Sequence, residues 1–295
     1  MEAPTFEWIS ILSNSEGELV CCDYHPKFGL AYIAKQKTCR ALVVNGTIWR
    51  QWDDDTWPNI WNIRFSASGC IFAWNIPGGI VALAPREWHF ILIGEVSNVI
   101  ASPNYLFATY SEDSSSLADP DQLESNIAAV FSTSGDFVLS LNKMLDKVTY
   151  DGIFMEVSHA CAGKNDEFYF LAHGTPYIWI LDVKAATLQP LPADDVENAI
   201  AISADQNSVY LLERGVSSCM VRSTALVDRS WSLLEVDRGP SAILLDRCAA
   251  FKPVIGVLGG GFLTSGRDKA ELLKHNFSRP ISAVAISAVG SSGSE

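Results

Sequence analysis

A pattern of two apolar strands joined by a short polar turn recurs along this chain and constrains its fold more than any other feature. The best-formed copy is residues 198–213, in which the polar turn 203–207 separates two runs of β-forming residues. Weaker copies occupy residues 19–34, 61–74 and 96–110. A strand pair that recurs in this way predicts an array of similar β units.

The spacing of the copies predicts how many strands each unit contains. The turn residues are 43, 36, 56, 45, 43 and 41 positions apart, in the order Asp23, Ser66, Ser102, Ser158, Ser203, Asp246 and Ser287. The first unit has room for four strands, at 19–24, 30–34, 40–44 and 47–52. Asn45 and Gly46 separate the last two strands and are the residues that a type I′ hairpin turn favours. A period near 40–45 residues with four strands per period resembles WD40-like and related β-propeller repeats over almost the whole chain.

This resemblance implies an all-β fold, a single β-propeller with six blades of four antiparallel strands, and seven blades as the alternative. In the six-blade arrangement, residues 5–12 form the outer strand of the last blade, which combines strand candidates at 241–246, 253–258, 262–264 and 270–277. A seventh blade would use residues 281–287 as its inner strand. We expect one domain over residues 1–290 and a flexible tail at 291–295. A β-sandwich or a solenoid is the remaining alternative.

Charge narrows the classes of partner. The net charge of −13 argues against nucleic-acid binding and against an anionic membrane surface, both of which need clustered Lys and Arg. The same charge is compatible with a basic protein partner, or with a role in solubility alone. The seven cysteines show no C-x-x-C pattern and most lie in apolar runs, which indicates buried free thiols in a reducing compartment. We find no signal peptide and no long apolar segment, and expect a cytoplasmic protein.

The resemblance also implies a ligand face, formed by the loops before each inner strand and those between the second and third strands. Acidic residues and tryptophans concentrate in the loops assigned to that face. Tryptophan is common in the energetically important centres of protein interfaces. The alternative is that these loops are simply polar and that the tryptophans cap the core. The predicted partner-binding residues are Trp52, Asp53, Asp54, Asp55, Trp57, Trp61, Asp119, Asp121, Glu124, Asp194, Asp195 and Glu197.

Catalytic and metal-binding patterns are weak. Asp53–Asp55 could supply oxygen ligands to calcium, but three adjacent carboxylates rarely face one ion. His173 could act as a general base, and His159 with Cys161 could form a nucleophilic pair, but no third group orients them. The glycines at 256–261 lack the Lys-Ser/Thr of a phosphate loop. We therefore predict no catalytic residue, no metal and no cofactor.

Three functions remain open at this stage. The first is a non-enzymatic propeller that binds a protein, as an inhibitor or immunity-type protein against a basic toxin or as a scaffold in a complex. The second is a propeller enzyme, lactonase- or hydrolase-like, with a central divalent metal and a small-molecule substrate. The third is a domain of a larger scaffold protein.

Overall fold

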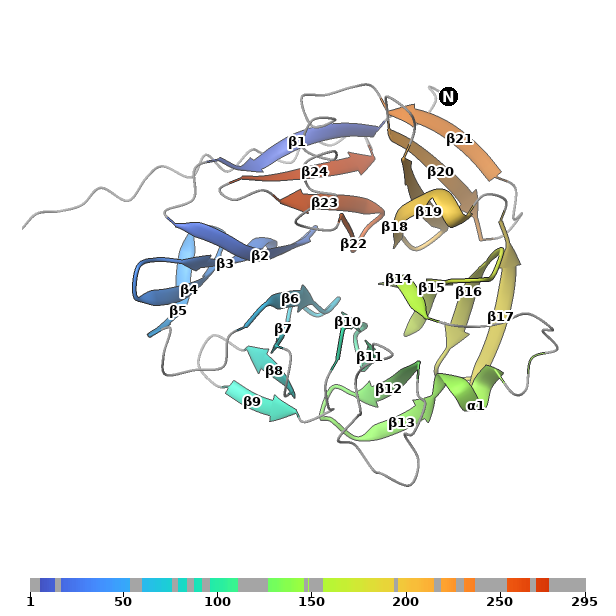
Figure 1. The fold of residues 1–295 in the computed structure, drawn as a ribbon, viewed down its shortest axis with the longest axis horizontal. Helices are drawn as coiled ribbons and strands as arrows, with labels where there is room; N and C mark the ends of the chain where they lie inside the picture. Colours follow the sequence, from blue (N-terminus) through green and yellow to red (C-terminus); the bar gives the residue numbers. More distant parts are fainter. Residues whose placement is uncertain are drawn as a thin grey trace, which may run out of the picture.

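The structure, a computed structural model, describes residues 6–13, 17–53, 60–75, 79–83, 88–91, 96–110, 127–145, 148, 156–193, 196–214, 219–226, 231–236, 254–265 and 269–275. These residues form six four-stranded antiparallel sheets arranged as a ring (Figure 1). Each sheet has an inner strand next to the axis of the ring, and the following strands of that blade lie progressively farther out. Neighbouring inner strands contact one another all the way around, from β2 to β6, β10, β14, β18, β22 and back to β2. The chain is therefore a β-propeller.

The first three blades follow one another directly along the chain. Blade one contains β2 (Glu18–His25), β3 (Gly29–Lys35), β4 (Cys39–Val44) and β5 (Thr47–Asp53). Blade two contains β6 (Asn62–Phe65), β7 (Ile71–Asn75), β8 (Gly79–Leu83) and β9 (Trp88–Ile91). Blade three contains β10 (Asn98–Ala101), β11 (Tyr105–Thr109), β12 (Ala128–Ser132) and β13 (Phe137–Ser140), followed by the short helix α1 (Leu141–Leu145).

The other three blades complete the ring. Blade four contains β14 (Val157–Ala162), β15 (Glu167–Ala172), β16 (Tyr177–Asp182) and β17 (Thr187–Pro192). The 3₁₀ turn η1 (Val196–Asn198) leads into blade five, with β18 (Ala199–Ala204), β19 (Ser208–Arg214), β20 (Cys219–Ala225) and β21 (Trp231–Val236). Blade six contains β22 (Ile255–Val257), β23 (Gly261–Ser265), β24 (Ala270–His275) and, as its outer strand, β1 (Phe6–Leu12).

The first strand of the chain therefore closes the ring. β1 pairs antiparallel with β24 from Phe6 opposite His275 to Leu12 opposite Ala270, which confirms the expected outer strand at residues 5–12. The predicted hairpin in blade one is also confirmed. Asn45 and Gly46 have φ angles of 48° and 74°, the left-handed values that a type I′ turn requires.

The fold-class prediction needs correction in three places. The seven-blade alternative is wrong, because six sheets of described residues already close the ring; the strand predicted at 281–287 lies outside the described residues. In the last blade, the inner strand is the three-residue β22, and the predicted strand at 241–246 lies outside the described residues. In blade four, the inner strand is Val157–Ala162, not the predicted 152–158, so Ser158 is not a turn residue.

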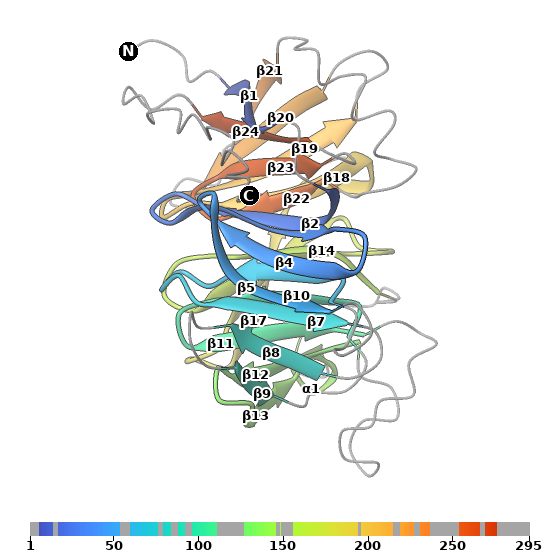
Figure 2. The same ribbon diagram turned by 90° about the vertical axis from the view of Figure 1, so that its left-hand side faces the viewer.

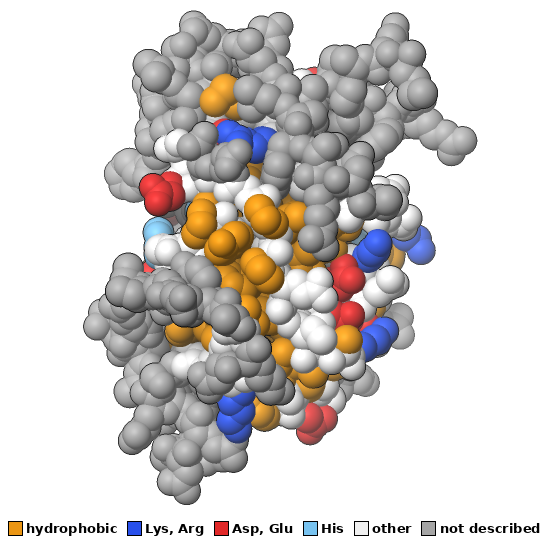
Figure 3. All heavy atoms as spheres, turned by 90° about the vertical axis from the view of Figure 1, so that its right-hand side faces the viewer, with side chains coloured by type: hydrophobic (Ala, Val, Ile, Leu, Met, Phe, Trp, Pro, Cys, Tyr) orange, Lys and Arg blue, Asp and Glu red, His pale blue; other side chains and the backbone are white. Residues whose placement is uncertain are grey.

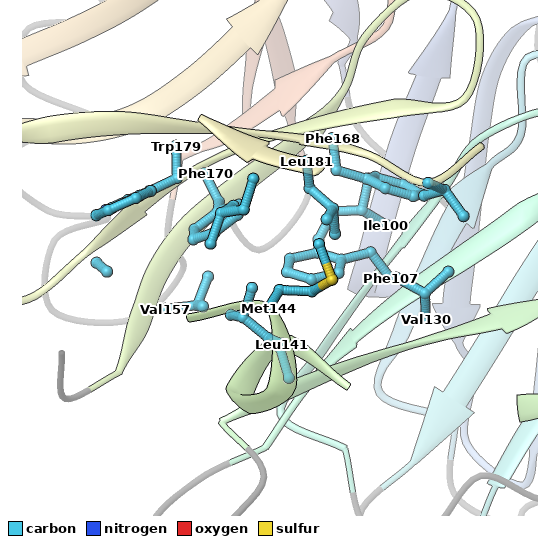
Figure 4. Close-up of a cluster of buried hydrophobic side chains, with 14 of the residues drawn as sticks. Ile100, Phe107, Val130, Leu141, Met144, Val157, Phe168, Phe170, Trp179 and Leu181 are labelled. Carbon is cyan, nitrogen blue, oxygen red and sulfur yellow. The ribbon is translucent and has the colours of Figure 1, made fainter. Parts of the chain in front are cut away.

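The core consists of six clusters of buried side chains, each between two neighbouring blades. Figure 4 shows the cluster between blades three and four, where the aromatic rings of Phe107, Phe168 and Phe170 lie together. Leu141 and Met144 of α1 join this cluster, so the helix fills the space between β13 and β17. Most of the hydrophobic stabilisation therefore comes from contacts between blades.

The two ends of the ring are distinguishable by strand direction. Because all inner strands run the same way, their first residues lie at one end, which we call the loop face, and their last residues lie at the other, the turn face. Figure 2 shows the ring from its edge, with blade one in front and both faces in profile. The turns within the first strand pair of each blade lie on the turn face, as does the predicted turn 203–207.

Hydrogen bonds join neighbouring blades at the turn face. The Asp23 carboxylate in blade one accepts the backbone N–H of Phe65 in blade two, with an O–N distance of 2.6 Å. The Ser203 hydroxyl in blade five donates to the Val257 carbonyl oxygen in blade six at 2.8 Å. Asp166 in blade four accepts hydrogen bonds from Ser102 and Asn104 in blade three. Asp23, Ser102 and Ser203, which marked the repeat in the sequence, thus connect one blade to the next.

Candidate partner-binding face

Trp61 is the most conspicuous side chain on the loop face. It directly precedes the inner strand of blade two, and 54% of its surface is exposed, which is unusual for a tryptophan. The peptide group that joins Ile60 to Trp61 is hydrogen-bonded on both sides: the Trp61 N–H donates to the Trp74 carbonyl at 3.0 Å, and the carbonyl of the buried Ile60 accepts from the Arg40 guanidinium at 3.0 Å. The indole is therefore presented to solvent from a fixed backbone, which is what a partner-binding aromatic residue needs.

The other tryptophan of this loop for which the structure gives a position is not on the surface. Trp52 is only 8% exposed and packs in the cluster between blades one and two. The prediction that Trp52 contributes to the binding surface is therefore wrong, because its position in β5 directs it into the core. Its neighbour Asp53 is exposed. Asp54, Asp55 and Trp57 lie outside the described residues.

Three glutamates lie at or just before the starts of inner strands. Glu18 begins β2, Glu156 precedes β14 and Glu197 is in η1 before β18; Glu18 and Glu197 are exposed and Glu156 is half-buried. Only Glu197 was predicted from the sequence. Glu18 and Glu156 could have been predicted from their sequence positions, because each lies at the start of an inner strand or directly before one. The remaining predicted acids, Asp119, Asp121, Glu124, Asp194 and Asp195, lie outside the described residues.

Strand register places Glu18 and Trp61 at a similar height beside the channel. The hydrogen bond between Asp23 and Phe65 aligns β2 with β6. Glu18 is five residues before Asp23 and Trp61 is four before Phe65, so at about 3.3 Å per residue their levels differ by about one residue. An acidic and an aromatic side chain from adjacent blades therefore share the rim of the channel.

The exposed lysines of the loop face lie farther from the axis. Lys37 is in the loop between the second and third strands of blade one, Lys143 is in α1 after the outer strand of blade three, and Lys269 precedes the third strand of blade six. No Lys or Arg lies among the described residues that begin the inner strands. Among the described residues, the three glutamates of this face therefore lie nearer the axis than its exposed lysines.

The histidines considered for catalysis and then set aside lie in different surroundings. His159 and Cys161 lie within the inner strand β14, not in a turn. Burial and, to a smaller extent, the nearby His173 lower the pKa of His159 to about 4, so the ring is neutral near pH 7. Burial strongly raises the pKa of the Cys161 thiol, which keeps it protonated and poorly nucleophilic. His173 is exposed, and its backbone N–H donates to the Glu156 carbonyl at 2.9 Å.

The cysteines largely match the sequence interpretation. Cys21, Cys22, Cys39 and Cys161 are free and buried, whereas Cys70 is exposed in the first turn of blade two. Within the described residues, no three His, Cys, Asp or Glu side chains come together as metal ligands. No described helix is long and apolar enough to cross a membrane.

A small cavity lies at the other end of the channel, near the turn face. Residues from the inner strands of five blades line it, and Asp23 and Arg64 are its charged members. Its volume, as the space open to the centre of a water molecule, is about 20 Å³, which is room for about one water. A small-molecule substrate needs far more space than this cavity offers.

The outer wall of blade four carries apolar surface. Figure 3 shows hydrophobic side chains gathered across the middle of this side, with charged side chains along its right-hand border. Pro190 and Pro192 are exposed on the outer strand β17. Proline lacks a backbone N–H and so disfavours the addition of a further strand. This wall is therefore poorly suited to strand-by-strand pairing with another chain.

No protein-family model matches the chain, and no curated protein matches it either. Solved structures do match. A structure of YCF48 bound to a D1 peptide aligns with a TM-score of 0.52 at 12% identity, covering 92% of this chain and 97% of that one. Virginiamycin B lyase from Staphylococcus aureus aligns with a TM-score of 0.49 at 11% identity, covering 91% and 99% of the two chains. The WD40 repeats of RRP9 align with a TM-score of 0.49 at 8% identity, covering 93% and 99%. The likeness to YCF48 shows a common fold, and this chain is a β-propeller of the kind that the WD40-like spacing of its sequence predicted.

Proposed function

We propose that this propeller is a non-enzymatic binding protein that receives a basic protein partner on its loop face, over the channel axis. The observation that carries the proposal is Trp61, whose indole is 54% exposed on a backbone held from both sides. An exposed tryptophan leaves a large apolar area in contact with water. Burial of that area in an interface contributes strongly to binding.

The charge of the surroundings supports a basic partner. Glu18 and Glu197 are exposed near the starts of inner strands, and the whole chain has a net charge of −13. Acidic groups around a central aromatic attract a positively charged surface and orient it on approach. An inhibitor of a basic toxin and a scaffold in a larger complex are the two forms of this function that we propose.

The test is affinity capture with three immobilised forms of the protein, read by mass spectrometry. The unchanged protein and Ile48→Ala should retain the same partner, while Trp61→Ala should lose it. Ile48 is the matched control, since it is 57% exposed but lies on the outer strand of blade one. Equal capture by Trp61→Ala and the unchanged protein would overturn the proposal.

Charge reversal separates the acidic contribution from the aromatic one. Glu18→Lys combined with Glu197→Lys should weaken binding at low salt by at least tenfold and reduce its salt dependence, because exposed charges act at long range and are screened by ions. Reversal of Asp53, Asp54 and Asp55 tests the outer loop in the same way. Unchanged affinity in both variants would exclude a basic partner surface even if Trp61 contributes.

A further inference from the structure

Arg64 occupies an unusual position in the channel at the turn face. It is in the inner strand β6, and its side chain is 14% exposed where it lines the small cavity on the axis. The cavity walls around it come from β2, β10, β14 and β22, and apart from Asp23 of β2 and the Cys161 thiol of β14 their side chains are apolar. An arginine that is mostly enclosed in this way normally has several hydrogen-bond acceptors.

Within the described part of the chain, the acceptor nearest to Arg64 is too far away. Its guanidinium Nη1 lies 3.9 Å from the Asp23 Oδ1 atom, beyond hydrogen-bonding distance. Both oxygens of Asp23 instead accept backbone hydrogen bonds: Oδ1 accepts the N–H of Tyr24 at 2.9 Å and Oδ2 accepts the N–H of Phe65 at 2.6 Å. The guanidinium of Arg64, which lines the cavity, is therefore available to hydrogen-bond to an acceptor from outside the protein.

The size and charge of the cavity restrict that acceptor. A volume of about 20 Å³ for the centre of a water-sized sphere admits one water or one small ion. Arg64 is the permanent positive charge among the lining residues, and the apolar walls strengthen its field. We propose that Arg64 makes the turn-face end of the channel a binding site for one small monovalent anion of the size of chloride.

The neighbouring Asp23 links this site to pH. An ionised Asp23 repels the anion, whereas a neutral Asp23 leaves the positive charge of Arg64 uncompensated. Burial raises the pKa of Asp23 to about 6, against the opposing effects of Arg64 and of the N–H groups of Phe65 and Tyr24. The other titratable group that lines the cavity is Cys161 of β14, and its thiol stays protonated. His25 of β2 does not line the cavity, and its Nε2 atom contacts the Ala67 carbonyl oxygen of the next blade. Anion binding should therefore be tighter below pH 6, by about tenfold, the effect of one unscreened charge nearby.

Thermal unfolding in sodium chloride and in sodium gluconate at equal ionic strength tests the site, because gluconate is too large for the cavity. With chloride tenfold above its dissociation constant at pH 5.5, the midpoint should rise by about 3 °C relative to gluconate. Arg64→Gln should abolish this difference, and Arg50→Gln, an exposed arginine on the outer strand of blade one, should retain it. Asp23→Asn should make the chloride effect independent of pH. An equal response of Arg64→Gln and the unchanged protein would overturn the proposal.

Bromide provides a measurement that does not depend on a variant folding. Crystals of the unchanged protein soaked in bromide should show an anomalous scattering peak within hydrogen-bonding distance of the Arg64 guanidinium. Peaks confined to the outer surface would mean that water alone satisfies Arg64, and the proposal would then be wrong.

Discussion

The turn face and the loop face of this ring are built from the same strands but are used differently. On the turn face, Asp23, Asp166 and Ser203 are buried and each hydrogen-bonds to a neighbouring blade. On the loop face, Trp61, Glu18 and Glu197 are exposed, and the link from Arg40 to Ile60 supports the backbone beneath Trp61. The aspartates and the serine that join blades on the turn face are therefore buried, whereas the loop face also presents exposed aromatic and acidic side chains to solvent.

The largest effect is expected where two inner strands come closest. A Cβ atom on Gly256 would lie 1.7 Å from the Ile202 carbonyl oxygen, which is backbone and cannot move without displacing β18. Gly256→Ala should therefore destabilise the protein by about 3 kcal/mol or more, measured by denaturant unfolding. Gly259→Ala is the control: it meets only the Pro26 side chain and a left-handed φ of +87°, so about 1 kcal/mol is expected. A similar cost for both would show that the contact between β18 and β22 is not critical.

The next effect concerns the hydrogen bonds between blades three and four. Asp166 is 1% exposed and accepts from Ser102 Oγ at 2.8 Å, Asn104 N at 3.0 Å and Asn104 Nδ2 at 2.8 Å. Asp166→Ala leaves these donors without an acceptor and should cost about 3 kcal/mol in calorimetric or denaturant unfolding.

Two further variants show whether that loss of stability comes from the hydrogen bonds of Asp166 or from its ion pair with Lys184. Lys184→Ala removes only the exposed partner of Asp166 and should change stability by less than about 0.5 kcal/mol. Asp166→Asn retains a residue that tolerates the left-handed φ of 67°. Its loss of stability should lie between those of Asp166→Ala and Lys184→Ala. If Lys184→Ala proved as harmful as Asp166→Ala, the ion pair and not the hydrogen bonds would join these blades.

The two buried aspartates should give pH dependences of opposite sign. The folded-state pKa of Asp23 is raised to about 6, from 3.8, mainly by burial, so its contribution is present below pH 4 and is lost as pH rises through 6. This amounts to roughly 2–3 kcal/mol across that interval. Asp23→Asn should remove this slope from unfolding free energies measured between pH 4 and 7, and an unchanged slope would assign it to another group.

Asp166 behaves in the reverse way. Burial acts to raise its pKa, but hydrogen bonds from Asn104, Lys184 and Ser102 together lower it. The stability that Asp166 provides is therefore present at neutral pH and is lost as pH falls below 4, through the folded-state pKa. The free energy of unfolding of Asp166→Asn should be lower at neutral pH and should change less as pH falls below 4.

The smallest effect on stability is expected on the loop face. Trp61→Ala removes an indole that is already 54% exposed, so the free energy of unfolding should change by less than about 1 kcal/mol. Truncation of the fully buried Trp179 provides the comparison, with about 3–5 kcal/mol expected. A large loss of stability in Trp61→Ala would mean that the loop face also holds the ring together.

The repeated part of the fold was predictable because its signals are local. Asn45 and Gly46 indicated a hairpin through their tolerance of left-handed backbone, and the spacing of Asp23, Ser102 and Ser203 indicated the period. β22 lies within the strand predicted at 253–258, but its place as the inner strand was not predicted, because it is three residues long and contains Gly256, whose lack of a side chain is needed for contact with β18 and weakens the apolar pattern. A more apolar segment nearby was chosen in its place.

The candidate site was predictable only in part. Trp52 and Trp61 look alike in the sequence, since both flank the same acidic loop, but β5 directs Trp52 into the core and the turn before β6 leaves Trp61 in solvent. That difference depends on strand register and on the neighbouring blade. Arg64 shows the same limitation: the sequence reveals its charge, but only the ring places it against a cavity.

The pairing of β1 with β24 has a consequence for synthesis on the ribosome. Phe6 is paired with His275, so β1 must wait for the synthesis of β24, the last described strand. At about 5–20 residues per second, this wait lasts roughly 13–54 seconds. During that interval β1 lacks its partner strand β24 and the ring stays open, so an unpaired strand edge is exposed until the last blade is made.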